Sequence, residues 1–169
     1  VTPANTLTAG KLDIRQLQLL AIGGQIRVEP TLLDLALQQQ QITVQVERID
    51  LTKLLQQHPT TDLTGNGLIS GTIPLLLNRS GASVEGGYIA AESPGGQLQY
   101  RPPTAENMAA TNPGMKVMLK ALDDFHYSVL SSNVSYDTNG KLLLALQLHG
   151  NNPALEAGRP INLNINLEE

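Results

Sequence analysis

Cysteine, tryptophan and charged residues are scarce or absent in this 169-residue chain, and each shortage narrows what the protein can be. Because it has no Cys, disulfides, thiolate metal sites and Cys nucleophiles are excluded. Aromatic residues make up 3% and charged residues 15%, against a usual charged share of about 25%. With a net charge of -4 and so few rings for base stacking, nucleic-acid binding is not indicated.

Long hydrophobic runs are also missing, although hydrophobic residues make up 41% of the chain. No stretch approaches the ~18 to 20 apolar residues of a membrane-spanning helix, and no secretory signal pattern opens the chain. The length predicts one domain over residues 1–169, since ~150 residues is the usual size of one core. Alternation continues to the last residues, so we expect a fragment of a longer protein.

What the chain does contain is alternation of apolar and polar residues with a period of two, which predicts β-strands. It is clearest in residues 161–167, where Ile or Leu alternates with Asn. We predict a mostly β, antiparallel fold. Further strands are expected at 12–14, 16–22, 26–28, 33–37, 42–47, 68–77, 84–90, 97–100, 127–136 and 142–148.

Glycine-containing dipeptides and tripeptides separate the expected strands and predict tight hairpin turns, because glycine readily adopts the positive φ that such turns need. These turn signals are Gly23-Gly24, Asn66-Gly67, Gly86-Gly87, Pro94-Gly95-Gly96 and Asn139-Gly140. We also interpret Gly65-Asn66-Gly67 as a hairpin turn and not as a phosphate-binding loop, since a strand pattern follows it.

Two short helical segments interrupt the β pattern, at about 51–57 and 104–124. Asp50 is the expected N-cap of the first. In the second, Asn112 and Pro113 are an expected cap and first-turn pair, and Thr104 is an expected cap of a short turn before it. Met115 and Met118 recur at helical spacing, which favours a core-facing stripe over an adaptable lipid-facing patch.

No group of residues predicts catalysis, a metal site or a cofactor. His58, His126 and His149 stand apart in sequence, and no metal-ligand spacing links them. Asp123 and Asp124 near His126 are interpreted as solvated carboxylates at a helix end. We therefore expect that the protein is not an enzyme.

An apolar sheet face must be covered by a second sheet, by helices, or by a ligand or membrane. Two short helices cannot cover some ten strands. The residues alone leave two alternatives open, a sandwich or a curled open sheet whose groove something apolar fills.

A longer string of residues resembles a known family. The run from Leu63 to Leu75 resembles the "l-x-G-x-G-x-l-s-G-x-i-P-l" segment of YdbH-like members of the AsmA-like superfamily. The order of motifs over nearly the whole chain is similar too: 12–26, 49–55, 86–100, 121–127, 140–148 and 150–164.

This resemblance implies a module of an intermembrane phospholipid transport bridge: a long antiparallel twisted sheet curled into a hydrophobic groove. The parent protein would be anchored in the inner membrane and cross the periplasm, with this end near the outer membrane. Acyl chains would slide along aliphatic side chains, without catalytic residues. The expected groove residues are Val44, Val46, Ile73, Leu75, Leu77, Leu144, Leu146, Leu148, Ile161, Leu163 and Ile165.

The resemblance also implies a small YnbE-like outer-membrane lipoprotein as a partner. A strand without Lys or Pro is poorly protected against strand addition. We therefore expect a partner edge at Leu163, Asn164, Ile165, Asn166 and Leu167, or at the N-terminal strand near 7–14. The alternative function is a docking module that binds this lipoprotein without lipid contact.

Overall fold

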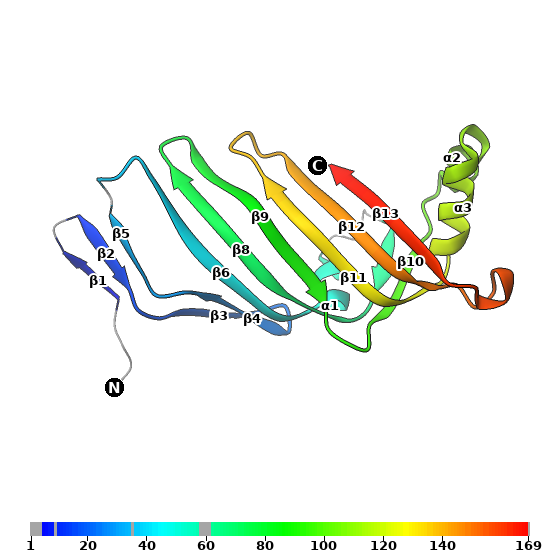
Figure 1. Cartoon of the computed structure of the whole chain (residues 1–169), viewed down its shortest axis with the longest axis horizontal. Coiled ribbons are helices and arrows are strands. Elements are labelled where there is room, and N and C mark those ends of the chain that lie inside the picture. Colours follow the sequence, from blue (N-terminus) through cyan, green and yellow to red (C-terminus); the bar gives the residue numbers. More distant parts are fainter. Residues whose placement is uncertain (1–4, 9, 35, 58–61, 169) are drawn as a thin grey trace.

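The computed structural model describes residues 5–8, 10–34, 36–57 and 62–168, and most of them belong to antiparallel β-strands (Figure 1). The strands are β1 (Thr6–Thr8), β2 (Lys11–Ile14), β3 (Leu17–Ala21), β4 (Gly24–Val28), β5 (Thr31–Asp34), β6 (Gln39–Asp50), β7 (Leu63–Gly65), β8 (Leu68–Asn78), β9 (Gly81–Ala91), β10 (Gly96–Tyr100), β11 (Phe125–Tyr136), β12 (Leu142–Asn151) and β13 (Ile161–Glu168). The helices are α1 (Leu51–Gln56), α2 (Ala105–Thr111) and α3 (Pro113–Leu122), with a 3-10 turn at Glu156–Gly158.

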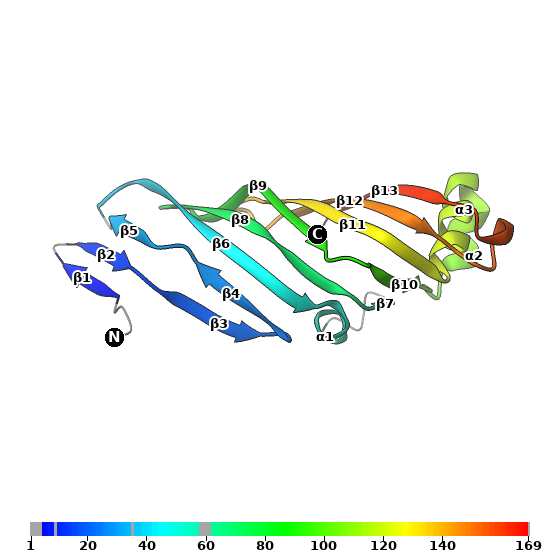
Figure 2. The ribbon, with the colours of Figure 1, turned by 60° about the horizontal axis from the view of Figure 1, so that its bottom comes forward.

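One large sheet of ten strands forms the body of the molecule. Its main path runs β13-β12-β11-β9-β8-β6-β4-β3, and β10 joins it through β11 and β7. These strands follow one another along the long axis, and the sheet twists as it goes (Figures 1 and 2). The predicted long, twisted antiparallel sheet with short helices is confirmed, and in the described residues it stays open instead of closing as a sandwich.

A smaller sheet, β1-β2-β5, continues the large one at its N-terminal end. Ile14 pairs with Thr31 and Leu17 pairs with Val28, so the hairpin keeps one register across the break between the sheets. Pro30 lies at this break and has no N–H to donate to a ladder. β5 ends at Asp34 instead of reaching residue 37 as predicted, and the Asp34 carboxylate accepts a hydrogen bond from the Ala36 N–H.

The hairpin turn predicted at Asn139-Gly140 is confirmed, and the one predicted at Gly23-Gly24 lies one residue earlier, since Gly24 already belongs to β4. Between β3 and β4, Ile22 and Gly23 both have positive φ and form a two-residue loop. Between β11 and β12, Gly140 has a φ of 87°, and the Gly140 N–H donates to the Asp137 carbonyl.

The hairpin prediction at Gly86-Gly87 was wrong. Both residues lie inside β9, where Gly86 has a φ of 72° and the pairing with neighbouring strands shifts. Such a shift marks a β-bulge, which needs the same backbone freedom as a turn. The turn between β8 and β9 is at Arg79-Ser80 instead.

The hairpin predictions at Gly65-Asn66-Gly67 and at Pro94-Gly95-Gly96 were also wrong. β7 does not pair with β8 but with β10, which in turn pairs with β11. The chain therefore kinks between β7 and β8, and again between β9 and β10. Pairing continues across both kinks, because β8 pairs with β9 and β7 pairs with β10. The Tyr127 hydroxyl donates to the Asn66 carbonyl over 2.6 Å, and any Cβ at Gly67 would collide with that hydroxyl. Glycine is therefore required for close approach at the kink.

The helices begin where their caps predict. The Asp50 carboxylate accepts from the N–H groups of Thr52 and Lys53, and the Asn112 side-chain oxygen accepts from those of Gly114 and Met115. Because Asn112 has extended backbone, the predicted segment 104–124 divides into α2 and α3. Thr104 is the N-cap residue of α2, as predicted, but its side chain makes no capping hydrogen bond.

The main core gathers at one end of the large sheet. Phe125 and Ala121 are completely buried there, beside Leu98, Leu122 and Tyr127. α1 contacts β6 and β7, and α3 contacts β10, so both helices lie at this end of the strands. Met118 packs against the core, which confirms the core-facing interpretation for that residue.

Candidate functional site

The large sheet has one continuous apolar face, which can be followed through the strand register. Directly opposed residues on antiparallel strands point to the same side. One cross-strand row joins residues 26, 46, 71, 89, 132, 146 and 165. A second joins residues 42, 75, 84, 136 and 142, and between them lie the pairs 28–44, 44–73, 134–144 and 144–167. Most of these residues are Leu, Ile or Val, so the face is aliphatic from β4 to β13.

All eleven predicted groove residues lie on this face. Five of them are in the core or pack against it: Val46, Leu148, Ile161, Leu163 and Ile165. The other six are not in contact with that core: Val44, Ile73, Leu75, Leu77, Leu144 and Leu146. Sequence reasoning grouped residues with two different environments.

We name these environments the covered band and the uncovered band. The covered band consists of Ile26, Val46, Ile89, Leu148, Ile161, Leu163 and Ile165, all in or against the core. The uncovered band consists of Val28, Ile42, Val44, Ile73, Leu75, Leu77, Val134, Leu142, Leu144, Leu146 and Leu167, none of which packs against the core. Most side chains of the uncovered band are half-buried among their sheet neighbours, and Leu167 is 43% exposed.

The opposite face of the sheet is polar and is tied together across strands. Arg27 pairs with Glu47 over 2.7 Å, and the Thr72 hydroxyl donates to Gln45 over 2.9 Å. Farther along, the Ser70 hydroxyl donates to Glu92, and Gln147 lies opposite Asn164. One sheet therefore separates an aliphatic side from a side that water solvates.

The two ends of the large sheet are open strand edges. Within the described residues, β13 pairs with β12 and β3 pairs with β4, and neither has a second neighbour. The five predicted edge residues 163–167 lie in β13, near the Lys141–Glu168 ion pair of 2.7 Å. That contact raises the pKa of Lys141 above its usual value. The other predicted edge, 7–14, is a hairpin of β1 and β2 with residue 9 outside the described residues.

Sequence reasoning missed β3 as an exposed edge. Leu17, Leu19 and Leu20 are 47%, 59% and 78% exposed, and a shallow hollow runs beside Leu17 and Leu20. The signal was present in the sequence, because this strand carries three leucines with no charge between them.

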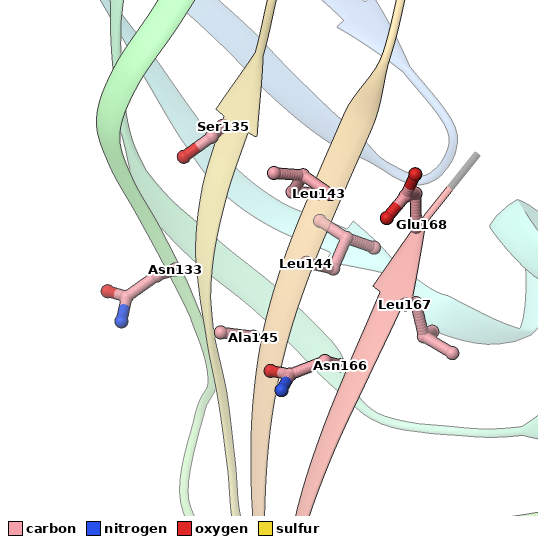
Figure 3. A pocket seen from close by; sticks show the side chains of 8 residues that line it. All are labelled: Asn133, Ser135, Leu143, Leu144, Ala145, Asn166, Leu167 and Glu168. Carbon is pink, nitrogen blue, oxygen red and sulfur yellow. The ribbon is translucent and has the colours of Figure 1, made fainter.

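A second shallow hollow lies over the ends of β11, β12 and β13. Figure 3 shows Asn133 and Ser135 from β11, Leu143 to Ala145 from β12, and Asn166 to Glu168 from β13 around it. Six of these residues lie on the polar face, because Asn133, Ala145 and Asn166 oppose one another, as do Ser135, Leu143 and Glu168. Leu144 and Leu167, which oppose each other in register, belong to the aliphatic face at this edge. The uncovered band therefore reaches the open edge of the sheet.

The acidic residues near His126 form an exposed polar cluster at the end of α3. The Asp124 carboxylate accepts from Gln97, lies 3.1 Å from His126 Nε2, and has a lowered pKa, chiefly because of the Gln97 hydrogen bond. Arg101 pairs with Asp123 over 2.8 Å. In the described part of the chain no three metal-ligating side chains come together, and His58 lies outside it.

The comparison with protein families decides what this sheet belongs to. The YdbH-like family, described as intermembrane phospholipid transport protein YdbH, matches residues 2–169. The chain belongs to the YdbH-like family. The comparisons with curated proteins and with solved structures gave no match.

For a YdbH-like protein, the activity of the family is intermembrane phospholipid transport, and phospholipid is the substrate that fits it. An aliphatic sheet face with no polar side chain clustered on it suits the acyl part of such a substrate. Among the described residues, no helix is both long enough and apolar enough to span a bilayer.

Proposed function

We propose that this YdbH-like chain is a passive module of an intermembrane bridge, along whose aliphatic face phospholipid acyl chains move toward the outer membrane. The observation that supports the proposal is the continuous row of aliphatic side chains across β4 to β13, with a polar face behind it. Each methylene that leaves water contributes about 0.8 kcal/mol, so aliphatic contact alone stabilises a bound lipid. The headgroup stays in water, and no covalent step takes place.

Intermembrane transport implies a periplasmic location, with the parent protein anchored in the inner membrane. Energy for directional transfer would come from outside this chain. The chain contributes a surface along which lipids move with little change in free energy.

Photocrosslinking in living cells tests the conduit. A photoreactive residue would replace Leu75 or Leu146 on the aliphatic face, and Gln147 or Asn164 on the polar face. Phospholipid adducts at the first pair and none at the second are expected. Absence of adducts at all four positions, in a folded protein at its normal level, would contradict the proposal.

A second candidate function is docking of a small YnbE-like outer-membrane lipoprotein by strand addition to β13. The observation that favours it is the open edge of β13, a strand that has neither Lys nor Pro between residues 161 and 168. An added strand would extend both the aliphatic face and the polar face by one position.

Two matched proline variants test the docking edge. Alternate residues of an edge strand direct their N–H groups away from the sheet, and the ladder places Asn164 of β13 and Gln18 of β3 in that set. Asn164→Pro removes such an N–H from β13, whereas Gln18→Pro does the same at β3, the other open edge. Loss of lipoprotein co-purification with Asn164→Pro alone is expected, with unchanged circular dichroism for both. Equal losses, or none, would contradict docking at β13. Retained lipoprotein binding in a chain that never crosslinks lipid would instead support a docking module without lipid contact.

A further inference from the structure

The aliphatic face is continuous, but only part of it packs against the core. Side chains of the covered band contact the core at the end of the strands where α1, α3 and β10 lie. Side chains of the uncovered band have no such partner among the described residues. The boundary falls between Val44 and Val46 on β6, between Leu146 and Leu148 on β12, and between Ile165 and Leu167 on β13.

We propose that phospholipid acyl chains bind on the uncovered band alone, and that the covered band is structural. This deepens the proposed function and rests on it. The acyl chains then run across the strands, over Val44, Ile73, Leu75, Leu144 and Leu167. Val46, Leu148, Ile161, Leu163 and Ile165 do not bind lipid, because they are in the core or pack against it.

The size of the uncovered band sets how much lipid it can hold. From β4 to β13 there are six strand-to-strand steps, so at about 4.8 Å each the band is about 29 Å long. An acyl chain extends about 15 Å, half of a ~30 Å bilayer core. Neighbouring rows are about 6.8 Å apart along each strand, which leaves room for two tails side by side. The band therefore holds about two phospholipids in file.

The end of the band at β13 fits this route. Leu167 is exposed and opposes Leu144 in the strand register. Aliphatic side chains thus continue to the last strand of the sheet. A lipid that reaches Leu144 can leave the sheet over Leu167.

Photocrosslinking at four half-buried positions of the intact protein, in living cells, separates the two bands. Leu75 and Leu144 represent the uncovered band, and Ile89 and Leu163 represent the covered band. We expect phospholipid adducts at Leu75 and Leu144, and at least tenfold fewer at Ile89 and Leu163. Because all four side chains are partly accessible, a probe can be accommodated at each.

The outcomes distinguish the band assignment from the proposed function. Adducts at Ile89 and Leu163 equal to those at Leu75 and Leu144 would overturn the assignment while phospholipid transport on this face stands. Adducts at none of the four would overturn the proposed function as well. Native mass spectrometry of the purified chain adds a second reading: one or two bound phospholipids are expected, and four or more would contradict the band's size.

Discussion

The covered and uncovered bands are built from the same residue types, Leu, Ile and Val, in the same alternation, yet their environments differ. Leu148 in the covered band is 2% exposed, whereas Leu144, four residues earlier on the same strand face, lies outside the core. What separates them is the position of the kinks and helices, which bring Phe125, Leu122 and Leu98 over one end of the strands. An aliphatic strand residue thus becomes core or binding surface through elements far away in sequence.

This difference predicts that truncation of the core has the largest effect on stability. Phe125→Ala should lower the free energy of unfolding by about 3 to 5 kcal/mol, because it empties a completely buried site. Leu75→Ala in the uncovered band should cost only about 1 kcal/mol. Denaturant titration of both variants measures this, and equal losses would erase the distinction between the bands.

A charge on the uncovered band should affect lipid binding more than stability. Leu144→Asp is expected to reduce bound phospholipid about tenfold, since a carboxylate must stay hydrated where acyl chains would lie. Ala145→Asp, next in the chain but on the polar face, is the matched control and should keep its lipid. Lipid content is measured after purification; an unchanged content in Leu144→Asp would contradict the band assignment.

The kink at Asn66 is joined to β11 by the hydrogen bond from the Tyr127 hydroxyl. Tyr127→Phe should destabilise the chain by about 1 to 2 kcal/mol, because the Asn66 carbonyl loses its donor. Burial also raises the pKa of the Tyr127 hydroxyl, so it stays protonated as a donor. The melting temperature reports the loss, and lipid content should stay unchanged. A variant as stable as the original would show that the bond does not hold the kink.

The smallest expected effect is on pH dependence at the end of α3. The pKa of Asp124 lies below its usual value of 3.8, mainly because Gln97 donates to the carboxylate. The stabilising contribution is therefore complete above the unfolded pKa and is lost as the pH falls through the lower, folded pKa. Gln97→Ala should move the Asp124 titration upward in an NMR experiment. An unchanged midpoint would contradict the assigned cause.

Alternation, turn chemistry and caps made much of the fold predictable. The clean Asn alternation of residues 161–167 becomes β13, and Asp50 and Asn112 begin helices as expected. The sequence also indicated which residues share a face, because that follows from the period of two.

Where the sheet bends, the glycine signals in the sequence did not distinguish a hairpin turn from a kink or a bulge. Gly67, Gly86 and Gly95 have the positive φ that hairpins need, but here they form a kink, a bulge and a second kink. A hairpin and a kink need the same local backbone, and only pairing with β10 and β11 distinguishes them. The division of the predicted groove residues into two bands depends on those long-range contacts, so no local pattern could have given it.

The most direct test of the central claim is an NMR measurement of contacts between bound phospholipid and the methyl groups of the 18.1 kDa chain. The account predicts cross-relaxation from acyl protons to the methyl groups of Val44, Leu75 and Leu144, and none to those of Leu148 or Leu122. Contacts to Leu148, or contacts spread equally over both bands, would contradict it.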